Sequence, residues 1–427
     1  MTTPSTALLT DQYELTMLQA ALADGSAGRR CTFEVFARRL PNGRRYGVVA
    51  GTARVLDAVA EFRFDSSVLA HLEPILDRPT LDHLAAWRFD GDIDGYPEGE
   101  LFFPDSPVMS VTGSFGSAVI LETVILSILN HDCAIASAAA RMSSAAGGRT
   151  TIEMGSRRTH ERSAVAAARA AYIAGFTATS NLEAGRRYGI PTAGTAAHAF
   201  TLLHDTEAEA FAAQAASLGV GTTLLVDTYD ITRGIATAIE VVGTDLGAVR
   251  IDSGDLGVLA RAARDQLDSL GATHTKVVLS GDLDEYAIAA LRAEPVDVYG
   301  VGTSLVTGSG APTAGMVYKM VEVDGRPVAK RSQNKRSSGG AKGALRRHRS
   351  TGTATEELVY LLAGPAPEQQ DGDRILPVPL VRAGIALESQ TLSDARRRLA
   401  DALVSLPWEG LKLSHGDPAI PTTMPGN

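Results

Sequence analysis

The residues that point most directly to chemistry are a histidine behind small side chains and an aspartate in an apolar run. His198 comes directly after five small residues, 193–197, which leave room for a ligand close to the backbone. Such a histidine is either a core side chain held by a hydrogen bond or a nucleophile with space around it. Asp227 lies in "LLVDTYD" and, if buried, needs a partner. A carboxylate that orients one imidazole nitrogen leaves the other free to react, so the two residues are candidates for a catalytic pair.

Charged residues follow two further β-rich runs. Arg250 and Asp252 alternate in "VRIDSGD", so on a strand their side chains share one face. Arg250 suits an anion and Asp252 suits sugar hydroxyls or Mg²⁺, although a salt bridge between them or to a helix fits the same spacing. In "EMGSRR", Arg157 and Arg158 are candidates for gripping a carboxylate, or are simply solvated.

Glycines directly follow two more runs, in "SGDLDE" from Ser280 and in "GVGTS" from Gly300. Backbone N–H groups at such turns can line an anion, although each turn alone is more simply a strand-to-helix connection. Neighbouring strand ends of a barrel commonly share one phosphate, so two successive glycine turns favour a phosphate site. Lys276 opens its strand and is expected at the opposite face, which disfavours Schiff-base chemistry.

The elements that must position these residues follow a repeating pattern from residue 148 onward. A short β-rich run is followed by a polar cluster and then by a helical pattern, and the seven runs are 149–155, 175–181, 190–195, 222–228, 248–254, 276–282 and 296–303. This pattern predicts parallel strands with the polar clusters at their carboxyl ends. The units are too few for a regular eightfold barrel of about 250 residues. We therefore expect an irregular or incomplete α/β barrel.

The sequence on either side of this pattern has α+β character. Residues 1–130 are expected to form an N-terminal α+β domain, which the C-terminal segment 350–427 joins. The barrel is expected over 131–349, and 416–427 is expected to be a loose tail.

Composition excludes several classes of protein. The 427 residues include 40 basic and 49 acidic side chains, and the net charge of -9 argues against a general nucleic-acid binder. The two cysteines are far apart and suggest neither a disulfide framework nor a zinc site, which favours a reducing compartment. We find no secretory signal and no apolar run of membrane-spanning length, so we expect a cytoplasmic protein without a membrane partner.

One basic segment departs from this acidic average. Residues 330–349 hold eight Lys or Arg among scattered Gly and Ser. They form either a basic loop that faces an anionic ligand or a solvated hairpin.

Taken in order, these motifs resemble the nicotinate phosphoribosyltransferase family. The matching segments are "LLTDQYELTM", "EMGSRR", "TSN", "GIPTAGTAAHAF", "LVDTYD", "VRIDSGDL", "LSGDLDE", "YGVGTSLVTG" and "YKMVEVDGRPVAKRSQNK". They cover most of residues 7–345 and share the family's order and spacing. The last eighty or so residues match only in general layout.

The resemblance implies an ATP-coupled ligase that works in NAD salvage. Nicotinate and 5-phosphoribosyl 1-pyrophosphate would give nicotinate mononucleotide and pyrophosphate, while ATP gives ADP and phosphate. His198 would be phosphorylated transiently and Asp227 would support its ring. Mg²⁺ would accompany the two phosphorylated substrates and stabilise the leaving-group charge.

The resemblance also assigns the substrate contacts. Arg157 and Arg250 would contact nicotinate and the phosphates. Asp252 and Asp282 would contact the ribose hydroxyls or the metal. The glycine turns would hold the 5-phosphate, through Ser280, Gly281, Gly302 and Thr303. Tyr13 would stack on the pyridine of the neighbouring subunit, which implies a homodimer with shared sites.

Ser180 lies near the place where relatives that use nicotinamide carry an acidic residue for the amide. Without that negative charge a carboxylate substrate is not repelled. The residues after "GSRR" depart from the family pattern, so the resemblance assigns no role to Arg158.

Two other readings remain open on the sequence. The first is a related phosphoribosyltransferase that uses nicotinamide or quinolinate, although no convincing second set of cations for quinolinate is visible. The second is a nucleic-acid-binding protein that uses residues 330–349, which the acidic net charge disfavours. The sequence does not decide whether residues 331–346 close over the site.

Overall fold

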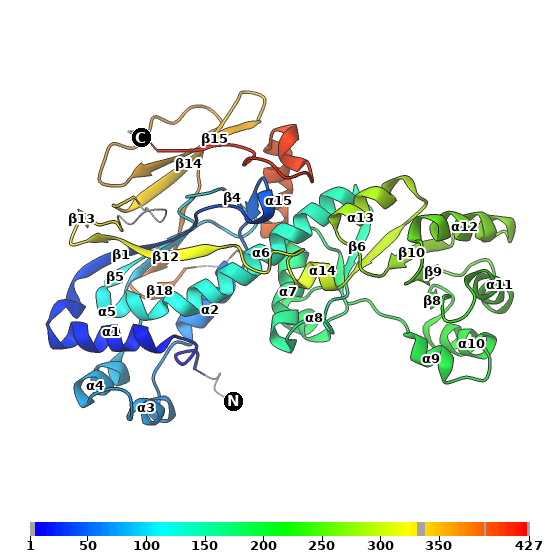
Figure 1. Cartoon of the computed structure of the whole chain (residues 1–427), viewed down its shortest axis with the longest axis horizontal. Coiled ribbons are helices and arrows are strands. Elements are labelled where there is room, and N and C mark those ends of the chain that lie inside the picture. The colour runs from blue at the N-terminus through cyan, green and yellow to red at the C-terminus, as the bar shows by residue number, and fades with distance from the viewer. Residues whose placement is uncertain (1–4, 331–337, 388–389, 425–427) are drawn as a thin grey trace. The chain divides into compact units, whose positions relative to one another are not determined.

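The computed structural model describes residues 5–330, 338–387 and 390–424, and its chain divides into two compact units (Figure 1). Unit 1 comprises Met1–Ser137 and Ala311–Asn427, and unit 2 comprises Ala138–Gly310. The barrel part therefore ends at Gly310, not at residue 349 as the sequence suggested. The reason is that β12 (Met316–Val323) pairs antiparallel with β1 (Arg30–Ala37) along its whole length.

Unit 1 is built on an antiparallel sheet of seven strands. Their order is β13 (Arg326–Pro327), β12, β1, β5 (Met109–Ser114), β3 (Asp92–Gly95), β17 (Val378–Arg382) and β18 (Ile385–Ala386). Seven of the eight residues of β1 are buried, and Phe33 on it stacks on Tyr318 of β12 with ring centroids 4.8 Å apart. Such cross-strand aromatic pairs fix the register of the sheet.

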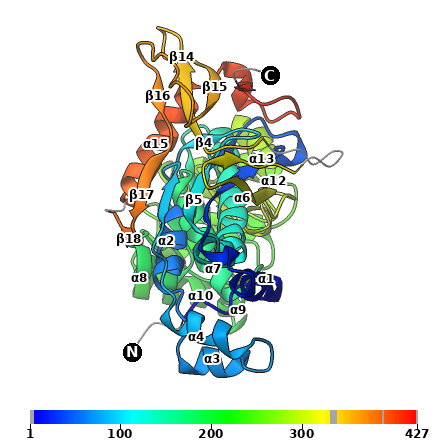
Figure 2. The same ribbon diagram turned by 90° about the vertical axis from the view of Figure 1, so that its left-hand side faces the viewer.

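Helices of unit 1 pack around this sheet. They are α1 (Gln12–Ala23), α2 (Thr52–Ala60), α3 (Ser66–Leu72), α4 (Arg78–Ala86), α5 (Phe115–Ala118), α6 (Glu122–Ala146), which continues into unit 2, and α15 (Leu392–Ser405). Asp65 and Asp77 cap α3 and α4 by accepting backbone N–H groups of the first turn. Helix α15 lies beside β16 (Arg374–Ile375), and Arg374 and α15 line one small cavity (Figure 2).

The long helical segment Phe115–Ala146 corrects one expectation from the sequence. By length and composition it is apolar enough to cross a membrane, although no such run was recognised in the sequence. In the fold, 61% of its most apolar window is buried against the rest of the protein. It therefore has the packing of a core helix.

Part of the basic segment differs from both of its readings. Its described part contains β14 (Lys342–His348), which pairs with β15 (Ala354–Leu361) in a sheet of four strands that β16 and β19 (Thr422–Thr423) complete. Lys342 binds Glu34 at 2.8 Å, and both side chains are almost fully buried. These residues are neither loop nor solvated hairpin. Residues 331–337, the centre of the expected loop, lie outside the described part of the chain.

Arg346 is the most deeply buried cation among the described residues of unit 1. It donates to Glu100 at 2.6 Å, to Glu357 at 2.5 Å and to the Leu101 carbonyl at 2.9 Å, and its side chain is 1% exposed. The Tyr96 hydroxyl donates to the second oxygen of Glu357 at 2.7 Å. The network joins β14 and β15 to the short β4 (Leu101–Phe102), which pairs with β2 (Gly47–Val48).

Part of the expected loose tail is also ordered. Strand β19 pairs parallel with β15, and Ile420 is 1% exposed.

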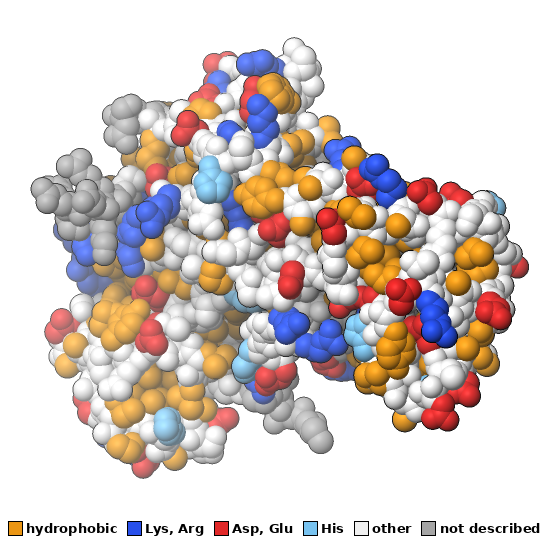
Figure 3. All heavy atoms as spheres, turned by 45° about the vertical axis from the view of Figure 1, so that its right-hand side comes forward, with side chains coloured by type: hydrophobic (Ala, Val, Ile, Leu, Met, Phe, Trp, Pro, Cys, Tyr) orange, Lys and Arg blue, Asp and Glu red, His pale blue; other side chains and the backbone are white. Residues whose placement is uncertain are grey.

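The surface carries acidic and basic side chains interspersed with apolar ones over the face in Figure 3.

Unit 2 is an incomplete barrel, as expected from the sequence. Its six parallel strands lie in the order β7 (Ala178–Thr179), β6 (Thr150–Glu153), β11 (Val298–Val301), β10 (Lys276–Ser280), β9 (Ala248–Ile251) and β8 (Thr223–Leu225). The seventh expected run, 190–195, makes only a single bridge, between Thr192 and Thr179. No ladder among the described residues joins this end of the sheet to β8, so the barrel stays open there.

Helices follow the strands of unit 2. They are α7 (Glu161–Ile173), α8 (Leu182–Tyr188), α9 (His198–Leu202), α10 (Glu207–Leu218), α11 (Ile231–Val242), α12 (Leu256–Ser269), α13 (Glu285–Ala290) and α14 (Thr303–Val306). Helices α10 to α12 lie outside the curled sheet (Figure 1). Asp230, Asp255 and Asp284 cap α11, α12 and α13 with their side chains. Part of each polar cluster therefore begins a helix and is not free for a ligand.

The buried network predicts an asymmetric response to loss of charge. Arg346→Met leaves the buried carboxylate of Glu357 without a cation and leaves Glu100 paired only with the exposed Arg374, so we expect a loss of about 3–5 kcal/mol in the apparent free energy of unfolding. Arg382→Met removes an exposed pair with Asp94 and should cost about 0–1 kcal/mol. Urea unfolding of the two variants measures both changes, and equal losses would contradict this account.

Candidate active site

His198 and Asp227 come together as the sequence suggested. His198 begins α9, and Asp227 follows β8 by two residues. The Nε2 atom of His198 lies 3.9 Å from Oδ1 of Asp227, and Nδ1 lies 3.1 Å from the Thr228 hydroxyl. The imidazole is 42% exposed, whereas the carboxylate is 1% exposed. The ring is thus open to a substrate on one side and faces a buried carboxylate on the other.

The two oxygens of Asp227 have different surroundings. Oδ2 accepts the backbone N–H of Asp252 at 2.8 Å and the hydroxyl of Ser253 at 2.9 Å. Oδ1 is buried and has no hydrogen-bond partner. A buried, unpaired carboxylate oxygen is unfavourable unless a cation or donor approaches it. An imidazole N–H or an imidazolium at His198 is the group positioned to do so.

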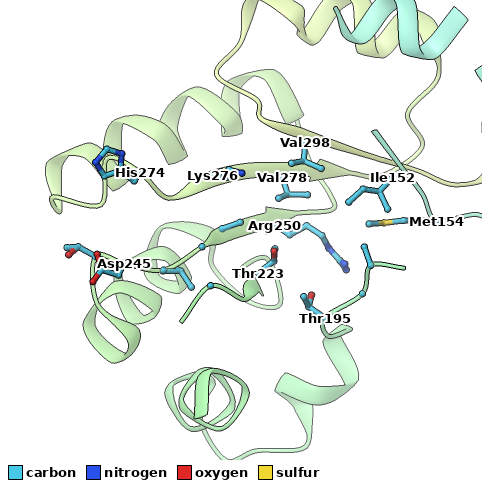
Figure 4. A pocket seen from close by; sticks show the side chains of 17 residues that line it. Ile152, Met154, Thr195, Thr223, Asp245, Arg250, His274, Lys276, Val278 and Val298 are labelled. Atoms are coloured by element: carbon cyan, nitrogen blue, oxygen red, sulfur yellow. The ribbon is translucent and has the colours of Figure 1, made fainter. Parts of the chain in front are cut away.

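The concave side of the curled sheet encloses a cavity of about 510 Å³. Arg250 of β9 extends into it toward Thr195 and Met154 (Figure 4). The guanidinium forms no hydrogen bond or ion pair with any described residue, and its Nε is buried without a partner. The expected alternative of a salt bridge with Asp252 is therefore wrong, because Asp252 accepts a hydrogen bond from Ser280 instead. Arg250 is an unpaired cation in an enclosed space, which suits an anionic ligand.

The first glycine turn follows β10 and packs closely against the loop that follows β9. Gly281 has φ +117°, and a Cβ at this position would lie 2.3 Å from the carbonyl oxygen of Asp252. Only glycine fits so close an approach. The next residue, Asp282, also has a positive φ, of 44°, and is exposed.

The second glycine turn follows the neighbouring strand β11. Gly302 and Thr303 stand at the start of α14, and both are partly exposed. Because β10 and β11 pair in parallel, the two turns end at one edge of the sheet. The structure thus brings the residues expected to bind phosphate to that edge.

The "EMGSRR" segment leaves β6 at the same edge. Glu153 is buried and accepts hydrogen bonds from the Thr179 hydroxyl and from the N–H of Gly155, and burial raises the pKa of its carboxyl. These bonds hold the turn that carries Arg157, which is exposed and forms no hydrogen bond or ion pair with a described residue. Ser180 is exposed on the next strand end and donates its N–H to the Glu153 carbonyl.

Tyr13 belongs to unit 1 and is 46% exposed near the start of α1. Its pKa is raised to about 12, first by burial of its hydroxyl end and then by Glu122 and Glu14. Glu14 is fully buried, accepts from the N–H and hydroxyl of Thr123, and has a pKa raised to about 7 by burial. The aromatic ring is therefore held on a fixed support and remains accessible.

Sequence reasoning missed several residues of this edge. Thr228 and Ser253, which contact His198 and Asp227, each follow a strand-end aspartate, and that position was the available signal. Lys276 opens β10 at the end of the strand opposite the glycine turn, as expected, and it also lines the same cavity as Arg250, which was not expected. The alternation of Lys276 and Val278 on β10 contained that information.

The chain contains no cluster of three His, Cys, Asp or Glu side chains suited to a metal, within the residues that were described. Asp282 directly follows Gly281, and Asp252 accepts a hydrogen bond from the Ser280 hydroxyl at the same turn. Mg²⁺ is commonly held by one or two carboxylates together with substrate phosphates, so these residues fit a metal that arrives with its substrate.

Comparison with known proteins gives one consistent result. Residues 8–130 match the model of the nicotinate phosphoribosyltransferase N-terminal domain, and residues 150–356 match the nicotinate phosphoribosyltransferase family model. The chain is 66% identical over 423 residues to nicotinate phosphoribosyltransferase pncB1 of Mycobacterium tuberculosis, covering 97% of this chain and 94% of the relative. It is 40% identical over 337 residues to nicotinate phosphoribosyltransferase of Bacillus subtilis, covering 76% and 69%.

The fold is also similar to a solved structure. Human nicotinic acid phosphoribosyltransferase superposes with a TM-score of 0.83 at 25% identity and covers 97% of both chains.

The close approach at Gly281 yields a prediction for the edge of the sheet. Gly281→Ala adds a methyl group within contact of the Asp252 carbonyl at a strained φ, so we expect a loss of about 1–3 kcal/mol in apparent unfolding free energy. Gly194→Ala is the control, because its added Cβ meets nothing within 4 Å. Thermal unfolding of both variants tests this, and an unchanged Tm for Gly281→Ala would rule out the steric argument.

Proposed function

The chain belongs to the nicotinate phosphoribosyltransferase family, and we propose that it couples ATP hydrolysis to nicotinate mononucleotide synthesis through a phosphohistidine at His198. The enzyme acts in NAD salvage. The observation that carries the phosphohistidine proposal is the exposed imidazole of His198 beside the buried, unpaired oxygen of Asp227.

The synthetic step joins the pyridine nitrogen of nicotinate to C1 of the ribose. The C1–O bond to pyrophosphate breaks and its electron pair leaves with the pyrophosphate, so positive charge develops at C1 and negative charge on the leaving group. Arg250 is proposed to hold the nicotinate carboxylate inside the cavity, because it is unpaired there. Arg157 and the turns at Gly281 and Gly302 are proposed to contact the phosphates.

The energy-coupling step uses His198. One ring nitrogen attacks the γ-phosphorus of ATP, and the bond to the bridging oxygen breaks to release ADP. Water later attacks the phosphorus, the P–N bond breaks and phosphate leaves, which regenerates the imidazole. Asp227 lies on the Nε2 side and would stabilise the positive ring, so Nδ1 is the nitrogen proposed to carry the phosphoryl group.

Mg²⁺ is the proposed cofactor and, when bound, neutralises charge on the pyrophosphate and ATP phosphates. Asp252 and Asp282 are the residues proposed to hold it or the ribose hydroxyls. Ser280 supports this arrangement, because its hydroxyl donates to Asp252 and fixes that carboxylate.

We further propose a cytoplasmic homodimer. Both cysteines are free and buried, in keeping with a reducing compartment, and cell fractionation checks the location. Large apolar side chains stand exposed near the catalytic edge, namely Leu202, Leu203, Tyr229 and Val258. These exposed apolar side chains support the proposal of a partner. The nucleic-acid alternative loses support because Lys342 and Arg346 are buried in ion pairs.

Product analysis tests the function and the phosphohistidine together. With nicotinate, 5-phosphoribosyl 1-pyrophosphate, ATP and Mg²⁺, we expect nicotinate mononucleotide, pyrophosphate, ADP and phosphate. With γ-labelled ATP, an acid-labile label should appear on the wild-type protein and disappear in His198→Ala, together with the stimulation by ATP. Asp227→Asn should lower the labelling rate by about tenfold or more, since the neutral amide no longer balances the ring charge.

Two controls accompany this experiment. Nicotinamide and quinolinate replace nicotinate in parallel reactions, and a preference for either would exclude the proposed substrate. Retention of the label in His198→Ala would exclude His198 as the phosphorylated residue.

Mixing two inactive variants tests the shared site. If Tyr13 serves the neighbouring subunit, co-expressed Tyr13→Ala and His198→Ala chains form heterodimers with one intact site each. We expect about a quarter of wild-type activity from a statistical mixture. No recovery, when each variant alone is folded and inactive, would mean that Tyr13 acts within its own subunit or that no dimer forms.

A further inference from the structure

Two unpaired cations line one wall of the cavity on the concave side of the sheet. Besides Arg250, the lining includes Lys276, which stands at the first position of β10. The ammonium group of Lys276 has neither a hydrogen bond nor an ion pair with a residue in the described ranges, and Lys276 is the sole lysine in the sequence of unit 2. A cation without a partner, directed into an enclosed space, is free to act on a ligand there.

The register of the sheet places both side chains on the same face. Lys276 pairs with Ala248 and Val278 pairs with Arg250, so Lys276 stands two residues before the neighbour of Arg250. Residues two apart on a strand point to the same side, and diagonal neighbours across strands are about 7–8 Å apart at Cα. Figure 4 shows the Lys276 side chain running along the sheet toward Val278, in the direction of Arg250.

The charge of the cavity favours an anion. Its lining contains the two cations Arg250 and Lys276 and one carboxylate, Asp245, which lies at the opposite end from Thr195 beside His274 (Figure 4). Apart from His274, the remaining lining residues are apolar, or carry hydroxyls, or are glycines. Because Arg250 extends toward Thr195, a carboxylate bound to it would lie at the end of the cavity away from Asp245 and would also experience the field of the lysine.

We propose that Lys276 is a specificity-determining residue, which acts with Arg250 to select pyridines that carry a carboxylate over neutral pyridine amides. The proposal rests on the proposed function, because it assigns the nicotinate carboxylate to Arg250. Lys276 is itself exposed at the mouth of the cavity, so its contribution is a through-space attraction that salt screens in part. It is a positioning charge and not a catalytic group.

Steady-state kinetics of Lys276→Met tests the proposal. We expect the KM for nicotinate to rise about threefold to tenfold, with kcat nearly unchanged, because a lost attraction to the bound carboxylate weakens binding without altering the reacting atoms. The KM for nicotinamide should stay within about twofold of the wild-type value. Lys276→Arg should restore the nicotinate KM, since it keeps the charge.

Ionic strength and a matched variant complete the design. The difference in nicotinate KM between wild type and Lys276→Met should shrink as salt rises from about 0.05 to 0.5 M. Arg261→Met removes one positive charge from the same unit outside the cavity, where Arg261 pairs with Glu294, and should leave both KM values unchanged.

The outcomes separate this inference from the proposed function. A wild-type enzyme that makes no nicotinate mononucleotide overturns the function itself. If the wild type is active and Lys276→Met changes the KM of both pyridines equally, or of neither, Lys276 does not determine specificity and the inference fails.

Discussion

A buried carboxylate that is only half satisfied is the interaction on which the catalytic edge depends. Asp227 fixes one oxygen to the backbone of Asp252 and to Ser253, which joins the ends of β8 and β9. Its other oxygen has no donor, and the ring of His198 lies 3.9 Å away. Since an unpaired buried charge is costly, the fold favours any state in which the imidazole becomes a donor or a cation. The same contact thus stabilises the strand ends and prepares the histidine.

The polar clusters after the strands perform two tasks that the sequence alone does not separate. In two loops an aspartate near the strand end belongs to the site, as Asp227 and Asp252 do, whereas the one three residues later, Asp230 or Asp255, caps the next helix. Both tasks require short acceptors at the same end of a parallel strand. Sequence spacing therefore predicted which side chains gather at the carboxyl ends of the strands, while the structure was needed to show their hydrogen-bond partners.

Other differences between sequence and structure have similar physical causes. The parallel strands of unit 2 follow from local β-rich runs, so their order along the chain was predictable. The boundary at Gly310 was not predictable, because β12 pairs with β1, a strand near the other end of the sequence. Burial of Lys342 and Arg346 escaped prediction for the same reason, since their partners Glu34 and Glu100 are distant in sequence. Long-range pairing, and not local pattern, decided each of these points.

The open barrel has a consequence for how unit 2 accommodates change. A fully closed barrel can change its diameter only by breaking backbone hydrogen bonds between its strands. Here residues 193–197 run from the Thr192 bridge to α9 and belong to no ladder. They lead directly into His198, the first residue of α9. This short segment is held only at its two ends, so it can shift without breaking the hydrogen bonds between strands. In the proposed phosphorylation cycle His198 gains and loses a bulky, doubly charged group, and this segment can absorb the displacement while the rest of unit 2 keeps its shape.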